Sequence, residues 1–144
     1  MQDGSYIPAI GVLIIENEKV LMVKHTENAE HLTDTYALPA GRLEPGESLK
    51  SGALRELFEE TGIIAKEEDL IKFPKPFYAD ILRKSGETLS FKWDVFVAKK
   101  FTGEIRESDE TIPEWVDLDK VKNLNLLINT QNAINEGLKI LKSL

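Results

Sequence analysis

Three glutamates, at positions 56, 59 and 60, lie close together in the sequence and directly after Arg55. On an α-helix, residues three and four apart are neighbours on one face, so these carboxylates would share a face. Their mutual repulsion destabilises such a helix unless a cation binds. Mg²⁺ takes oxygen ligands and commonly combines a few carboxylates with substrate phosphates. The spacing therefore predicts a helix that holds a divalent metal against a phosphorylated substrate.

The flanking residues predict where this helix begins and how it packs. A turn is expected at residues 45–47, and Ser48 is a good N-cap for a helix that starts after it. Glu47 would lie at the positive end of the helix dipole. Small residues at Gly52 and Ala53 leave room for a metal and a phosphate. The opposite face is expected to pack on the core through Leu54, Leu57, Phe58 and Thr61.

An ordinary acidic surface helix is the simpler alternative, with Arg55 as the i,i+4 partner of Glu59. Any two of these residues would favour that reading, but the longer pattern does not. Residues 41–63 match G-x5-E-x7-R-E-U-x-E-E-x-G-U at every position, where U is a bulky aliphatic residue. The matching residues are Gly41, Glu47, Arg55, Glu56, Leu57, Glu59, Glu60, Gly62 and Ile63.

This pattern is the Nudix box, and the chain resembles the Nudix hydrolases through it. The LPAG turn before the box and the EWVDLDKV segment late in the chain are compatible with the same family. The resemblance implies hydrolysis of a pyrophosphate bond in a nucleoside diphosphate linked to another group, with Mg²⁺ or Mn²⁺ as cofactor. It also implies an α/β/α sandwich with a mixed, partly barrel-like sheet.

The resemblance also implies roles for individual residues. Glu47 and Arg55 would orient the metal-binding side chains, and Glu59 or Glu60 could also act in catalysis. Which carboxylate is the general base stays open. The implied metal ligands are the Ala40 carbonyl, Glu56, Glu59 and Glu60.

A further carboxylate from outside the box is expected near the metal. Glu110 is favoured because it lies just before the strand-like segment 112–116, although acidic loop residues are often simply solvated. The other candidates for this carboxylate are Glu107, Asp109 and Glu114.

Residues that could contact the substrate are harder to separate from ordinary surface and core residues. Arg42 and Arg83 could bind phosphate in bidentate fashion, or could be surface cations. Tyr78 could stack on a base, as could Phe77 and Trp93, but aromatic residues in strands more often belong to a core. The spacing of His25 and His31 suits no helical zinc pair. His31 or Tyr36 could touch the substrate, but surface histidines are the expectation.

Length and composition predict one globular domain, residues 1–144, with 42% apolar and 30% charged residues. The chain has no cysteine, which excludes disulfides and thiolate chemistry. A net charge of −7 argues against a dedicated duplex nucleic-acid binder. The longest apolar run, residues 7–15, is too short to cross a membrane, and the N-terminus lacks the basic start of a secretion signal. A cytoplasmic location is therefore expected.

Hydrophobic patterning predicts strands before, between and after two main helices. Residues 7–15 and 19–24 are expected to form a hairpin, and residues 78–83 and 88–98 a second one across a turn at 84–87. Short strands are expected at 36–38 and 112–116. Asp117 is expected to cap a short helix, and residues 130–143 form a terminal amphipathic helix. Helices would cover both faces of the sheet.

Three functional classes fit these observations. The first is an enzyme acting on nucleoside triphosphates (damaged ones included), ADP-ribose or nucleotide sugars, or dinucleoside polyphosphates. The second is a catalytically silent nucleotide sensor, although such proteins usually lose a box glutamate and this chain keeps them all. The third is an RNA 5′-end pyrophosphohydrolase, which the acidic balance disfavours. A homodimer is possible.

Overall fold

The computed structural model describes residues 5–144. Part of the segment on which the expectation about secretion rests, residues 1–4, lies outside the described residues. The elements follow the order β1 (Ile7–Leu13), β2 (Ile15–Glu16), β3 (Lys19–His25), β4 (Tyr36–Ala37), β5 (Ala40–Arg42), α1 (Leu49–Thr61), a 3₁₀ turn (Glu67–Asp69), β6 (Leu70–Lys72), β7 (Phe77–Leu82), β8 (Thr88–Ala98), β9 (Thr111–Asp117), a second 3₁₀ segment (Leu118–Asn123) and α2 (Thr130–Lys142).

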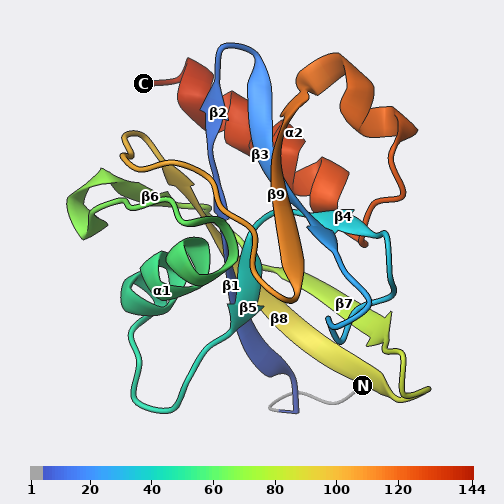
Figure 1. Cartoon of the computed structure of the whole chain (residues 1–144). Helices are drawn as coiled ribbons and strands as arrows, with labels where there is room; N and C mark the ends of the chain where they lie inside the picture. The colour runs from blue at the N-terminus through green and yellow to red at the C-terminus, as the bar shows by residue number, and fades with distance from the viewer. Residues whose placement is uncertain (1–4) are drawn as a thin grey trace.

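The strands form two sheets between the two helices (Figure 1). The larger sheet has the order β5-β1-β8-β6, and β7 also pairs with β8. In the smaller sheet, β3 pairs with β2, β4 and β9. β1 and β8 are parallel, while β5, β6 and β7 pair antiparallel, so the sheet is mixed. Neither strand order closes into a barrel, and the expected α/β/α sandwich is confirmed.

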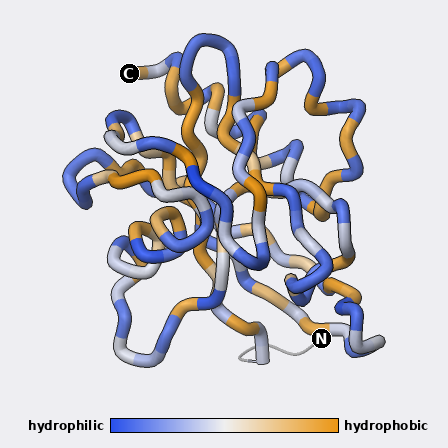
Figure 2. The backbone as a smooth tube through the Cα atoms, viewed as in Figure 1, coloured by the Kyte–Doolittle hydropathy of each residue, from blue (hydrophilic) through white to orange (hydrophobic). Residues whose placement is uncertain are grey.

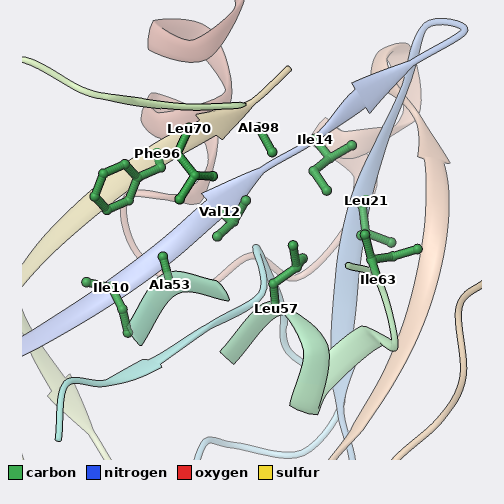
Figure 3. Close-up of a cluster of buried hydrophobic side chains, with 10 residues drawn as sticks. All are labelled: Ile10, Val12, Ile14, Leu21, Ala53, Leu57, Ile63, Leu70, Phe96 and Ala98. Atoms are coloured by element: carbon green, nitrogen blue, oxygen red, sulfur yellow. The ribbon is translucent and has the colours of Figure 1, made fainter. Parts of the chain in front are cut away.

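Alternate residues of the central strands belong to two separate hydrophobic cores. On the α1 side, Val12 packs with Leu57, and Figure 3 shows Ala53 and Leu57 extending from the helix toward β1. On the α2 side, Leu13 packs with Ile134. Successive residues of a strand point to opposite faces, and here both faces are covered. The sequence of β1 is therefore apolar throughout instead of alternating.

The hydropathy of the backbone follows this layering. Apolar residues concentrate along the central strands and the inner helix faces, and polar residues occupy the outer loops and the β2–β3 turn (Figure 2). Gly137 on α2 lies directly against Leu13, where a Cβ would overlap the leucine side chain. The glycine therefore lets α2 approach β1 closely.

Two expectations about local structure need correction. Residues 7–15 do not pair as a whole with residues 19–24. The chain passes from the larger sheet to the smaller one at Ile14, so only the β2 part of residues 7–15 pairs with β3. The segment after β9 is a 3₁₀ helix without a side-chain cap from Asp117. That carboxylate instead contacts Lys19 (3.5 Å) and Lys120 (3.6 Å).

The β7–β8 hairpin is confirmed. The Arg83 N–H donates to the Glu87 carbonyl (2.9 Å), and Gly86 takes the φ of 89° that the turn requires. No helix within residues 5–144 has the length and apolar character needed to cross a membrane.

Candidate active site

Helix α1 begins after Ser48, as the sequence predicts, and ends at Gly62. The Ser48 side chain accepts a hydrogen bond from the Ser51 N–H (3.1 Å), which satisfies one free donor of the first turn. At the other end, Gly62 adopts the left-handed conformation with φ 84° and its N–H donates to the Phe58 carbonyl (2.9 Å). Leu57 and Thr61 are buried. The helix is thus held by its caps and its core face, with the glutamates on the remaining surface.

Phe58 does not pack in the core as expected. Its side chain is 45% exposed, and the guanidinium of Arg106 lies 4.7 Å from the ring centroid. Arg106 also donates to the Phe58 carbonyl (3.2 Å) through Nη2 and to the Thr61 carbonyl (2.8 Å) through its backbone N–H. The core face of α1 is narrower than predicted, and the chain that follows β8 covers Phe58 instead.

Arg55 joins the glutamates of the box into one network. Its Nε and Nη2 donate to both oxygens of Glu47 (2.7 and 2.9 Å), which is a bidentate pair. Nη1 donates to Glu56 and to Glu59, each at 3.2 Å, and Nη2 donates to the Arg42 carbonyl (3.0 Å). The Arg55 hydrogen bonds lower the pKa of Glu47 to about 2. Arg55 therefore connects Glu47 with Glu56 and Glu59, and the expected role of Glu47 and Arg55 in orienting metal ligands stays a prediction.

Glu56 and Glu60 are carboxyls held in unfavourable surroundings. Burial raises the pKa of Glu56 to about 7, against the lowering effect of Arg55. Burial also raises the pKa of Glu60, and the charges of Glu56 and Glu110 add to that effect. Glu60 accepts a hydrogen bond from the Ala40 N–H (2.8 Å). A nearby cation would relieve both the burial and the repulsion.

Gly41 lies directly beneath the Glu56 carboxylate. A Cβ at residue 41 would fall inside 3.0 Å of all three carboxylate atoms, a distance that real Cβ atoms essentially never show. Position 41 of the box therefore favours glycine because the Glu56 carboxylate approaches it closely, and not because of its backbone angle.

The loop before β9 brings a further carboxylate to the helix. Glu110 shares one hollow with the box glutamates, and its neighbour Asp109 lines it too. The Thr111 hydroxyl donates to the Glu60 carbonyl (3.0 Å), and the Thr26 N–H donates to the Glu110 carbonyl (2.9 Å). The loop is thus fixed from two sides. The hollow as a whole is lined by Glu56, Glu59, Glu60, Ser108, Asp109 and Glu110.

The other acidic candidates lie elsewhere. Glu114 lies on β9 opposite Met22 of β3, and it accepts a hydrogen bond from the Tyr36 hydroxyl (3.3 Å). Glu107 does not line the hollow. Among the described residues, no three acidic or histidine side chains converge as a ready-made metal site. Glu56 and Glu59 face Arg55, and Glu60 faces the Ala40 N–H. The side chains of the lining residues are nevertheless five carboxylates and the Ser108 hydroxyl, and oxygen donors of this kind suit Mg²⁺ or Mn²⁺.

A second cleft of about 240 Å³ adjoins this hollow, and Glu56, Glu60 and Glu110 line both. Arg42 and Arg83 line the cleft as well. Tyr78 does not line the cleft, and its expected contact with the substrate stays a prediction. It is 54% exposed and packs edge-on against Tyr6, with ring centroids 4.9 Å apart, whereas its neighbours on β7, Ala79 and Ile81, line the cleft.

The two histidines are less exposed than expected. His25 is 5% exposed and its Nδ1 lies 2.9 Å from the Thr35 hydroxyl. His31 is partly buried and packs against His25 at a tilt of 48°, with ring centroids 4.6 Å apart. Burial lowers the pKa of His25 to about 4 and that of His31 to about 3. Both histidines and Trp93 line the cleft. No local sequence signal separates these residues from surface or core positions, because the cleft is formed by distant segments.

Comparison with known proteins agrees with this geometry. Residues 5–136 match the family model described as the NUDIX domain. The chain belongs to the Nudix family. The MutT protein of Methanosarcina mazei Go1 has a similar fold, with a TM-score of 0.74 over 99% of both chains at 24% identity. That likeness supports the fold alone.

Curated relatives are also similar in sequence. An ADP-ribose pyrophosphatase of Methanocaldococcus jannaschii is 30% identical over 81% of this chain and 66% of its own length. An oxidized purine nucleoside triphosphate hydrolase of Danio rerio is 36% identical over 56% of this chain and 48% of its own length. The chain thus spans about half to two thirds of these relatives.

Proposed function

We propose that this Nudix chain is a metal-dependent pyrophosphohydrolase that cuts a pyrophosphate bond in a nucleoside diphosphate linked to another group. We infer that residues 1–144 act as one such domain. The observation that carries the proposal is the shared wall between the carboxylate hollow and the cleft, formed by Glu56, Glu60 and Glu110. A diphosphate at this wall would meet the oxygen ligands of the hollow, and the rest of the substrate would extend into the cleft.

The residues of the hollow would hold a Mg²⁺ or Mn²⁺ ion. In this proposal Glu56, Glu59 and Glu60 are the carboxylate ligands, and the Ala40 carbonyl is a further one. Glu47 acts through Arg55, whose guanidinium contacts Glu56 and Glu59. A bound divalent ion supplies the positive charge that phosphate oxygens need and favours deprotonation of the attacking water.

The chain itself positions the substrate and accepts a proton. Water forms a new O–P bond, the bridging P–O bond breaks, and the leaving phosphate departs as an anion. A carboxylate of the hollow takes the proton from the water, with Glu59, Glu60 and Glu110 as the candidates. Arg42 and Arg83, which line the cleft, are proposed to contact the substrate.

Two other functions remain as alternatives to be tested. A silent nucleotide sensor would bind nucleotide without metal-dependent turnover, although every glutamate of the box is present. An RNA 5′-end pyrophosphohydrolase would prefer triphosphorylated RNA to free nucleotides, against the net charge of −7. A cytoplasmic location and a homodimer also stay predictions.

The test is a panel of nucleoside triphosphates, ADP-ribose, nucleotide sugars, dinucleoside polyphosphates and triphosphorylated RNA, each with Mg²⁺ or Mn²⁺. Product analysis identifies the bond that breaks. Glu60→Gln is the matched variant, because it keeps size and removes charge, and turnover should fall roughly a thousandfold or more. Wild-type turnover in Glu60→Gln, or no metal-dependent hydrolysis of any compound by the wild type, would contradict the proposal.

A further inference from the structure

The Glu110 carboxylate lies where the carboxylate hollow meets the cleft, and no hydrogen bond or ion pair to another described residue holds it there. Glu110 is exposed and belongs to the connection between β8 and β9, whose residues 104–110 form neither helix nor strand. The place of this carboxylate in the site therefore depends on the contacts that fix the backbone around it.

The backbone before and after Glu110 is tied to the last turn of α1. The Arg106 N–H donates to the Thr61 carbonyl (2.8 Å), and the Thr111 hydroxyl donates to the Glu60 carbonyl (3.0 Å). These contacts hold the connection against the helix that carries the box glutamates, but neither of them involves Glu110 itself.

A threonine in the loop after β3, Thr26, holds the backbone of Glu110 directly. The Thr26 N–H donates to the Glu110 carbonyl (2.9 Å), which continues the β3–β9 ladder by one pair beyond His25 and Thr111. The Thr26 hydroxyl donates to the Asp109 carbonyl (2.5 Å). Because one residue binds two consecutive carbonyls, the peptide unit between Asp109 and Glu110 cannot turn without losing a hydrogen bond. The direction in which the Glu110 side chain leaves the backbone is thereby set.

Thr26 is itself held in place by polar contacts. Its hydroxyl oxygen accepts from the Asn28 N–H (3.2 Å), so the hydroxyl both donates and accepts. Lys84 Nζ, from the turn between β7 and β8, donates to the carbonyls of Thr26 (3.3 Å) and Glu27 (2.7 Å). Thr26 lines neither the hollow nor the cleft, so its influence on the site passes through the residues that it binds.

We propose that Thr26 is a positioning residue for hydrolysis, which keeps the Glu110 carboxylate at the wall between hollow and cleft by binding the carbonyls of Asp109 and Glu110. This inference rests on the proposed function of the same site, in which Glu110 is a candidate proton acceptor. Catalytic groups lose rate steeply when they move by about an ångström, and supporting hydrogen bonds keep them in place. Without the hydroxyl only the N–H bond to Glu110 remains.

Thr26→Val tests this, because it keeps the branched shape and the backbone N–H bond and removes the hydroxyl. On the best substrate of the panel with Mg²⁺, kcat should fall roughly tenfold, while KM and the thermal midpoint of unfolding stay close to wild type. Thr26→Ser keeps the hydroxyl and should restore most of kcat. Thr88→Val is the matched control with wild-type kcat, because Thr88 is exposed and lines neither the hollow nor the cleft.

A double-mutant cycle with Glu110→Gln separates positioning from a general loss of structure. If Thr26 acts through the Glu110 carboxylate, adding Thr26→Val to Glu110→Gln should change kcat by less than about twofold. A further tenfold loss in that background would overturn the inference, as would wild-type kcat in Thr26→Val or a Thr26→Ser variant as slow as Thr26→Val. Wild-type kcat in Glu110→Gln also overturns it, since the group through which Thr26 acts would then be idle.

Lys84→Met takes the place of Thr26→Val if the latter does not fold. It removes the ammonium donor from the Thr26 carbonyl at an exposed side chain. It should lower kcat in the wild-type background and leave it unchanged in Glu110→Gln, and equal effects in both backgrounds would contradict the inference. Failure of the proposed function has a different signature, which is the absence of metal-dependent turnover by the wild type.

Discussion

Replacing Gly41 with alanine tests the active-site geometry at a residue that carries no chemistry of its own. The new Cβ would lie inside 3.0 Å of the Glu56 carboxylate, whereas ordinary contact begins at 3.4 Å. The carboxylate must therefore move by roughly 1 Å, and misplacement of this size typically lowers rates about a hundredfold. The obstacle is the flexible end of a side chain, so the fold should tolerate the substitution.

The assay measures kcat/KM with Mg²⁺ on the best substrate of the panel, together with the thermal midpoint of unfolding. We expect Gly41→Ala to lose about two orders of magnitude in kcat/KM, with a small change in the midpoint. Metal affinity, measured by titration of activity with Mg²⁺, should fall as well.

Gly86→Ala provides the matched control. It introduces the same methyl group in the β7–β8 turn, where nothing lies within 4 Å but φ is 89°. This variant should lose stability through backbone strain and keep its activity in the folded state. Wild-type kcat/KM and metal affinity in Gly41→Ala would refute the reasoning that Glu56 must occupy its observed position.

Three other predictions follow from the same contacts. Arg55→Lys loses the bidentate pair with Glu47, so kcat should fall about 10–100-fold with the fold intact by circular dichroism. Glu110→Gln should lower turnover more than Asp109→Asn in steady-state assays, because Glu110 adjoins the cleft and Asp109 does not; equal effects would argue against a role for Glu110. His25 has its pKa lowered from 6.5 to about 4 by burial, so folding favours its neutral form. The contribution of His25 to stability is present above pH 6.5 and is lost as pH falls toward 4. A His25→Gln variant should therefore show a shallower fall in the free energy of unfolding over that pH range, as measured by urea titration.

The sequence predicted the carboxylate face because helical neighbours are set by local spacing. Glu56, Glu59 and Glu60 have fixed relations on any helix, and Ser48 and Gly62 mark its ends through their own backbone preferences. The same pattern carried the family resemblance and the sandwich fold. Phe58 shows the limit of this reasoning, since periodicity places it near the core face but cannot say how wide a face the strands cover.

Strand partners were less predictable than strands. Residues 7–13 and 19–25 are both strands, but β1 pairs in parallel with β8 across the sequence and not with β3. Both segments are apolar on both faces, so their sequences do not record which neighbour or which sheet they join. The choice depends on packing between elements that lie far apart in the chain.

By itself the sequence determined the acidic helix, its N-cap and the oxygen chemistry expected there, because each depends on residues within a few positions of one another. Only the tertiary structure decided which residues surround the cleft beyond it. His31, Arg83 and Trp93 meet there because three distant segments are brought together by the two sheets. Tyr78 is excluded because side chains alternate along β7 and its neighbours take the inner face.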